Sequence, residues 1–337
     1  MGRQKKTGKT MHSFGKSVIL KLLFIIAAYI LIYVAIDQNI LNRQYKSIIV
    51  LIFVNVILAV SLNLVTGFLG ELSLGHAGFM MIGAYTGAIL TNYLAKAAPS
   101  LPNVVPVLLA VVLGGLLAGL VGCIIGIPVL RLRGDYLAIV TLAFGEIIRS
   151  LCENLTITNG AAGMSGINKY TNYKNFAYGF IIMAVSVIII SNLIKSRHGR
   201  AITSIRENYI AAESIGIPVA KFKILAFSVG AFFAGVAGVI YAHDQGMIMP
   251  SDAGYVKSID ILVIVVLGGM GSVRGSIVAA VILTVIKEVL RDAASYRQLI
   301  YAIVLIAMVI INNTASLARV KEKVNGWIFR KQMKEGE

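Results

Sequence analysis

Two ionisable residues of opposite charge, Glu146 and Arg149, stand in a stretch that is otherwise mostly apolar. Residues three apart share one face of a helix, so this carboxylate and this guanidinium are placed to form an ion pair. If a helix begins at Tyr136 on a membrane surface, Glu146 lies roughly 15 Å deep, near the bilayer centre. An ionisable residue at that depth is a functional candidate. An ion pair that only fixes helix packing explains the pattern equally well.

Polar residues also gather in two glycine-rich stretches, residues 63–78 and 267–276. Irregular backbone at membrane depth must be buried in protein or line a wet cavity, because lipid cannot satisfy its amide groups. Short, glycine-interrupted segments in both halves of a transporter mark its transport path, whereas single glycines more often just let helices pack closely. The residues predicted to line a path or gate are Asn63, Glu71, Ser73, His76, Thr141, Glu146, Gly268, Gly269 and Gly271.

A third pattern lies in the polar segment 195–218, where apolar residues recur every three or four positions. The spacing predicts one amphipathic helix over 201–215, which Gly216 ends. Such a helix lies on lipid or docks into a groove on a partner protein. Its apolar stripe consists of Ile202, Ile205, Tyr209, Ala212 and Ile215.

The elements that must position these residues are membrane-spanning helices. Of the 337 residues, 58% are hydrophobic and 14% are charged, whereas a soluble domain carries roughly 25% charged residues. Residues 47–65 contain no charge, and a run of about 18 such residues is long enough to span a bilayer. We predict an all-α integral membrane protein of about ten transmembrane helices, some of them short or broken. The helices are expected at 18–36, 47–65, 74–95, 104–130, 136–153, 176–194, 219–242, 259–271, 275–290 and 298–316.

The distribution of basic residues predicts which loops lie inside the cell. Placing the N-terminus in the cytoplasm puts 20 of the 31 Lys and Arg residues in inner segments and 8 in outer segments. Cytoplasmic loops carry such an excess, so we expect both termini inside a bacterial-type inner membrane. The chain then divides into a basic cytoplasmic tail 1–17, a transmembrane domain 18–316 with the cytoplasmic loop 195–218, and a second basic tail 317–337.

Several kinds of chemistry have no signature in the sequence. Cys123 and Cys152 lie in predicted spans and form neither a disulfide framework nor a metal-ligand spacing. No nucleophile–base pair stands out, so we expect neither an enzyme nor a cofactor. The basic tails suit anionic lipid better than nucleic acid, since no folded soluble domain is predicted. The phosphate-loop motif G-x-x-x-x-G-K-[ST] is also missing, so the chain cannot hold ATP by that device.

Four short motifs occur together in one order. They are LSLGHAGF at 72–79, RLRGDYLAIVTLAFGEIIR at 131–149, AAESIGI at 211–217 and GGMGS at 268–272. Over roughly residues 45 to 315 the chain resembles the LivM-type permeases of branched-chain amino-acid importers, and the second motif fits this type better than the sister LivH type. The loop 158–166 departs somewhat from the usual form of this family, and residues before 45 carry little resemblance.

The resemblance implies an ATP-binding cassette (ABC) importer in which this chain forms half of the pore. The implied partners are a LivH-like second permease, two cytoplasmic ATP-binding subunits, an extracytoplasmic substrate-binding protein and membrane lipid. The implied substrate is a branched-chain or similar small apolar amino acid, although relatives of these permeases handle urea or short amides. The loop 195–218 would couple the ATPases to the pore, with Arg206 and Glu207 as polar contacts. The implied coupling residues are Arg200, Arg206, Glu207, Ala211, Ala212, Glu213 and Gly216.

A different class of transporter also fits part of the pattern. A secondary transporter coupled to an ion gradient would have a similar number of helices, glycine-rich breaks and a buried carboxylate such as Glu146. It would not need an amphipathic helix in a large inner loop, so the segment 195–218 separates the two hypotheses.

Overall fold

The computed structural model describes residues 26–27, 29–34, 36, 38, 43–100, 102–132, 134–290, 302–303 and 306. The predicted tails 1–17 and 317–337 lie outside this part of the chain. Much of the predicted span 18–36 and nearly all of 298–316 also lie outside it.

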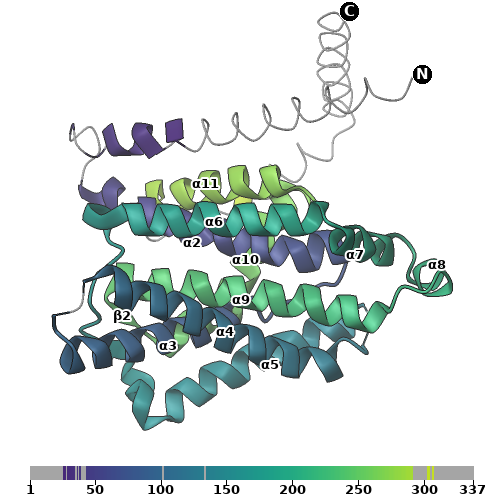
Figure 1. Ribbon diagram of the computed structural model, residues 1–337, viewed down its shortest axis with the longest axis horizontal. Helices are drawn as coiled ribbons and strands as arrows, with labels where there is room; N and C mark the ends of the chain where they lie inside the picture. Colours follow the sequence, from purple (N-terminus) through teal and green to yellow (C-terminus); the bar gives the residue numbers. More distant parts are fainter. Residues whose placement is uncertain are drawn as a thin grey trace, which may run out of the picture.

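The described residues form mainly helices, most of which run along the long axis of the molecule (Figure 1). All eight predicted segments from 47–65 to 275–290 are helical, with bounds within a few residues of those expected. The largest shifts are at the starts of two helices, which begin four residues early at Arg43 and Tyr255. The long helices are α2 (Arg43–Asn63), α3 (His76–Ala97), α4 (Val104–Val129), α5 (Asp135–Asn154), α6 (Phe176–Lys195), α7 (Arg197–Glu207), α9 (Val219–Gln245), α10 (Tyr255–Gly268) and α11 (Val273–Val289).

Short elements join these helices. Helix α2 continues as a π-helix, η1 (Leu64–Leu69), and α8 (Tyr209–Ser214) follows α7. Strands β1 (Met164–Ser165) and β2 (Met247–Ile248) pair antiparallel, with Met164 opposite Ile248. The remaining elements are the 3-10 turns η2 (Thr156–Thr158), η3 (Gly160–Ala162), η4 (Tyr173–Asn175) and η5 (Pro250–Ala253).

The connections between helices gather at two opposite ends of the bundle. One, which we call the α8 end, carries α7, α8, η1 and the α10–α11 junction; the other, the β end, carries β1 and β2 (Figure 1). Hydrogen bonds from Arg206 to Gly67 and from Gly271 to Asn63 join the segments at the α8 end. The predicted inner segments 66–73, 195–218 and 272–274 therefore lie together, although which side of the membrane they face stays a prediction.

Helices α2 and α9 form the centre of the bundle, and α4 and α6 lie at its edge. Within the described residues, four helices are long and apolar enough to span a membrane: Ile48–Leu69, Val104–Val129, Phe176–Lys195 and Val219–Gln245. Most side chains of the first are buried, whereas most of those on α4 and α6 are not. On α4, glycines such as Gly114 face α9 while Leu116, Leu120 and Ile124 are exposed. This division suits close packing on one side and lipid on the other.

The prediction of one amphipathic helix over 201–215 is wrong, because the helix is interrupted at Asn208. The backbone of Asn208 is extended (φ −159°, ψ 105°), and its side-chain Oδ1 accepts a hydrogen bond from the Ala211 amide at 3.1 Å. Asparagine is a strong helix N-cap, so it starts α8 instead of continuing α7. Of the predicted stripe, Ile202 and Ile205 on α7 and Ala212 on α8 are buried, while Ile215 is 75% exposed.

Candidate functional site

The first glycine-rich stretch is a break between two membrane helices. The regular turns of α2 end at Asn63, the π-helix η1 follows, and Gly70 terminates it in the left-handed conformation (φ +83°). Residues 70–75 are not helical, and α3 begins at His76. π-helical turns are rare and occur frequently at functional sites. We call residues 64–75 the first break.

The second glycine-rich stretch is a tight reversal between α10 and α11. Its four residues, 269–272, include Gly269 and Gly271 with φ of +87° and +83°. Residues other than glycine rarely adopt this backbone conformation. Gly268 and Gly275 bring the two helices into backbone contact, since a Cβ atom on Gly275 would lie 1.7 Å from the Gly268 carbonyl oxygen. We call residues 269–272 the second break.

A substitution at this contact is expected to have a large effect on stability. In Gly275→Ala the added methyl meets backbone atoms that cannot turn away, and overpacking of this kind typically costs about 1–3 kcal/mol or more. We expect a lower melting temperature of the purified protein in detergent. The matched control is Gly145→Ala in α5, where the nearest atom to a new Cβ is 3.6 Å away. Equal melting temperatures for the two variants would contradict this packing.

Asn63 joins the two breaks, although they lie about 200 residues apart in the sequence. Its Oδ1 accepts a hydrogen bond from the Gly271 amide at 2.9 Å, and its Nδ2 donates to Ser276 Oγ at 2.8 Å. The side chain is fully buried. The sequence indicated a common role for both stretches, and the structure places them in direct contact through this amide.

Other helices supply the hydrogen bonds that the first break lacks. Thr141 Oγ1 on α5 accepts a hydrogen bond from the Leu74 amide at 3.0 Å, and Ser258 Oγ on α10 accepts one from the Ala77 amide at 3.2 Å. His76 Nε2 and Ser61 Oγ lie 2.8 Å apart. Polar side chains of neighbouring helices thus bind the Leu74 amide of the first break and the first turn of α3, as buried backbone in a membrane segment requires. Of the residues predicted here, Ser73 is buried and its hydroxyl has no partner among the described residues.

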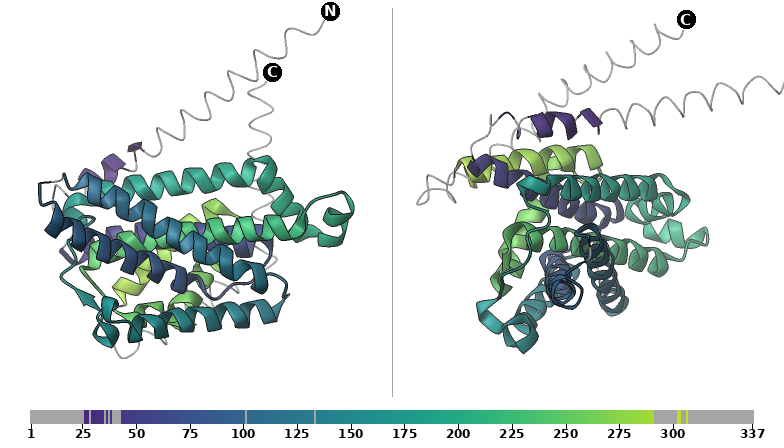
Figure 2. Two further views of the ribbon diagram at one scale, coloured as in Figure 1. Left: turned by 60° about the horizontal axis from the view of Figure 1, so that its bottom comes forward. Right: turned by 60° about the vertical axis from the view of Figure 1, so that its left-hand side comes forward.

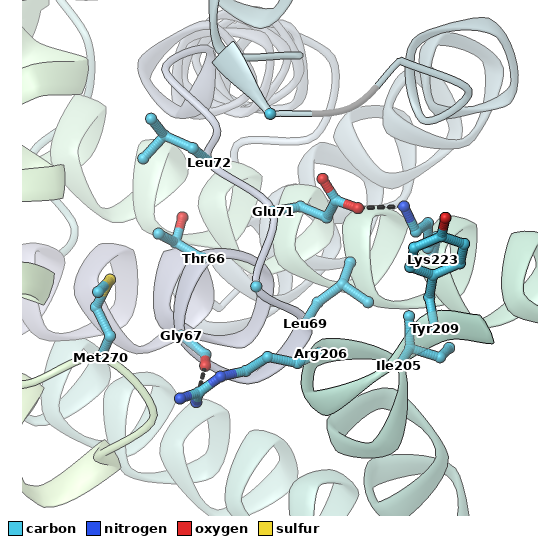
Figure 3. A pocket seen from close by; sticks show the side chains of 12 residues that line it. Thr66, Gly67, Leu69, Glu71, Leu72, Ile205, Arg206, Tyr209, Lys223 and Met270 are labelled. Atoms are coloured by element: carbon cyan, nitrogen blue, oxygen red, sulfur yellow. Dashed lines mark hydrogen bonds and ion pairs between the residues drawn. The ribbon is translucent and has the colours of Figure 1, made fainter. Parts of the chain in front are cut away.

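Two basic side chains hold the first break at the α8 end (Figure 3). Arg206 of α7 donates a hydrogen bond from Nη1 to the Gly67 carbonyl oxygen at 2.6 Å. Lys223 of α9 forms an ion pair with Glu71, and both side chains are nearly buried. A cavity of about 470 Å³ lies between η1, α7 and the start of α9. Sequence reasoning missed Lys223, because it counted only as one more basic residue beside an inner loop.

Arg206 therefore has a partner inside this chain, which the sequence did not indicate. The last carbonyl groups of a helix carry partial negative charge, and a guanidinium there is favourable. Its contact connects α7 with the end of the α2–η1 helix.

Glu146 and Arg149 form the predicted ion pair, with Nη1 and Oε2 3.4 Å apart. Arg149 also contacts Glu153 at 3.1 Å. Glu146 Oε1 accepts a hydrogen bond from the Tyr255 amide at 3.0 Å, so it caps the N-terminus of α10, where negative charge is stabilising. All three charged side chains are about one third exposed. Glu146 thus caps α10, whereas Thr141 on the same helix binds the first break.

A second ionic cluster, between α10 and α11, was not predicted. Lys287 of α11 lies 2.6 Å from Asp260 of α10, and Asn55 of α2 donates to Thr284 Oγ1 at 2.8 Å. The signal was present in the sequence, since Asp260 and Lys287 interrupt the apolar runs 259–271 and 275–290. In the part of the chain that the structure describes, no group of His, Cys, Asp and Glu could hold a metal ion.

Helix α8 projects from the bundle beyond the other helices (Figure 1), and it also does so in the left view of Figure 2. The apolar side chains of Ile210 and Ile215 are 63% and 75% exposed. Of the predicted coupling residues, Ala212 is buried within the chain. The exposed ones are Arg200, Arg206, Glu207, Ala211, Glu213 and Gly216.

Comparison with known proteins places these features in a family. A family model described as the permease component of branched-chain amino acid transport systems matches residues 44–311. The high-affinity branched-chain amino acid permease LivM of Escherichia coli K12 is 35% identical over 301 residues, which cover 80% of this chain and 69% of that protein. A probable LivM permease of Methanocaldococcus jannaschii is 27% identical, over 71% of this chain and 79% of that protein.

A sister permease is more distant. LivH of Salmonella typhimurium is 25% identical, over 80% of this chain and 92% of that protein. No solved structure matches the chain. The family match spans both breaks, α5 and the α7–α8 segment, and we conclude that this chain belongs to the permease component family of branched-chain amino acid transport systems.

Proposed function

We propose that this chain is one of two permease subunits that form the pore of an ATP-driven importer for branched-chain amino acids. The observation that carries the proposal is the exposed helix α8, joined through α7 and Arg206 to the first break. Exposed apolar residues on a helix outside the bundle suit docking into a groove on a partner protein. In this proposal α8 is the coupling element and the two breaks form the moving part of the transport path.

The membrane arrangement follows from the same proposal. The domain 18–316 would cross a bacterial-type inner membrane about ten times, with the tails 1–17 and 317–337 and the loop 195–218 in the cytoplasm. The excess of basic residues in these segments supports this orientation.

The partners would be a LivH-like permease, two cytoplasmic ATP-binding subunits and an extracytoplasmic substrate-binding protein. The similarity to LivM and the weaker similarity to LivH support a pair of related permeases. The chain has no phosphate-loop motif of its own, which supports separate ATP-binding subunits.

Coupling would work as a two-state movement. Closure of the ATPase subunits would push α8, and the rigid α7 would carry Arg206 and the Gly67 carbonyl with it. Because Asn63 joins the first break to the second, both would shift together and change access to the path. The charges of Glu146, Arg149 and Glu153, each about one third exposed, cannot face lipid without a high cost, so we place this side of α5 toward the path or the second permease.

The proposed function is tested by uptake into proteoliposomes that contain the complex purified through this chain. We expect ATP-binding subunits to co-purify and radiolabelled leucine to accumulate only with ATP on the side of those subunits. Collapse of ion gradients by ionophores is the control and should leave uptake unchanged. A panel with urea and short amides in place of leucine tests the substrate class.

The ion-coupled alternative has one observation in its favour. Charged residues lie on helices that we predict to span the membrane, among them Glu146 and the Asp260–Lys287 pair, and such groups serve as ion or proton sites in secondary transporters. Uptake that follows an ion gradient without ATP would establish that alternative.

A further inference from the structure

The cavity at the α8 end has the size and walls of a ligand site. Its volume of about 470 Å³ lies within the range of about 300–1,000 Å³ that is typical of small-molecule pockets. Most of its walls come from the first break, α7 and the start of α9, and Gly134, Tyr209 of α8 and Met270 of the second break complete them. In Figure 3 the side chains of Thr66, Glu71 and Arg206 lie around this space.

The charges of the described lining favour an anionic group. Glu71 and Lys223 neutralise each other in their ion pair. Arg206 donates to the uncharged Gly67 carbonyl, and it forms a loose ion pair with the exposed Glu207 carboxylate, 3.9 Å from its Nε and outside hydrogen-bond range. The formal charge of the lining is therefore +1, from Arg206 and Lys223 against Glu71. A guanidinium with unused N–H groups suits the planar shape of a carboxylate.

A polar group without a partner also lines the cavity. Thr66 is 6% exposed, and its hydroxyl has no hydrogen-bond partner among the described residues. Unpaired buried polar groups are rare in native proteins, so each one calls for an explanation. Threonine uses two side-chain rotamers in helices, and a rotation therefore lets its hydroxyl turn toward a ligand.

The rest of the lining is largely apolar, with Leu69, Leu72, Ile205 and Met270 among its residues. We propose that this cavity binds a free amino acid with an apolar side chain, with its carboxylate on Arg206, and that occupancy from the α8 side inhibits import. The inference rests on the proposed function, since it assigns a regulatory site to that transporter.

A ligand in this cavity would inhibit import because of the elements that form the walls of the cavity. The ligand would bridge α7 and η1, which move together in the proposed mechanism, and Lys223 at the start of α9, which that mechanism does not move. A ligand that binds only one arrangement of its walls shifts the population toward that arrangement. A high internal concentration of product would thus hold the transporter in the state with the cavity formed.

The test uses the complete complex in proteoliposomes with the α8 side facing the lumen. The lumen holds ATP and either no amino acid or millimolar leucine, and ATP hydrolysis is measured with substrate and binding protein outside. We expect luminal leucine to lower the rate about fivefold or more, as in typical allosteric couplings. Thr66→Val should bring the ratio of the two rates close to one. Ser228→Ala, which removes an unpaired buried hydroxyl that does not line this cavity, should keep the wild-type ratio.

A second variant is used if the complex that carries Thr66→Val does not assemble. Met270 is 56% exposed in the lining, and Met270→Trp should fill the cavity and abolish the response to luminal leucine. The inference is overturned if leucine leaves the wild-type rate unchanged, or if the cavity variants respond like the wild type. Equal inhibition by luminal phosphate would overturn the amino-acid assignment. A complex that is inactive even with an empty lumen would instead contradict the proposed function.

Discussion

Arg206→Ala should reduce leucine uptake by about 10-fold to 100-fold while the complex still assembles and hydrolyses ATP. The variant removes the hydrogen bond from α7 to the Gly67 carbonyl oxygen of the first break. Hydrogen bonds to charged groups contribute about 1.5–3 kcal/mol, and each 1.4 kcal/mol corresponds to about a factor of ten. Uptake and ATP hydrolysis are measured together in proteoliposomes, because their ratio reports coupling.

Two further variants separate the bond from the charge. Arg206→Lys keeps the charge but loses the planar set of donors, so we expect only partial recovery of uptake. Arg197→Ala removes an exposed arginine at the other end of α7 and serves as the control. If Arg206→Ala transports at the wild-type rate, the first break does not move through this contact.

Asn63→Leu should lower both the melting temperature and the uptake rate. The variant leaves the Gly271 amide without its acceptor and removes the donor to Ser276 Oγ. An unpaired buried polar group costs about 1–3 kcal/mol, which corresponds to roughly 2–12 °C for a domain of 150–250 residues. Uptake should fall further than the loss of folded protein explains, because the two breaks no longer move together.

The matched control for this prediction is Asn55→Leu. Asn55 is also buried on α2 and hydrogen-bonded to α11, but its partner Thr284 lies outside both breaks. We expect a similar decrease in melting temperature with nearly normal uptake per folded complex. Parallel losses of uptake in both variants would show that Asn63 contributes only stability.

The elements that the sequence predicted best are those with local signals. Long apolar runs located eight helices, and the spacing of Glu146 and Arg149 predicted their ion pair. Glycine clusters indicated both breaks. Each of these inferences needs only residues that are neighbours along the chain or along one helix.

The contacts that assemble the site have no local signal. Nothing near Asn63 indicates Gly271, and nothing near Arg206 indicates Gly67, since these pairs are set by how distant helices pack. The break at Asn208 was missed for another reason, because the apolar spacing on either side continued through it. There the capping hydrogen bond of the asparagine side chain outweighed the periodicity.

The central claim is that α8 docks on an ATP-hydrolysing subunit, and cross-linking from α8 tests it most directly. A photoreactive amino acid replaces the exposed Ile210, and cells are irradiated before the membranes are solubilised. Mass spectrometry then identifies the protein joined to this chain. The account predicts a cytoplasmic nucleotide-binding subunit. Cross-links only to lipid or to an extracytoplasmic protein would contradict it.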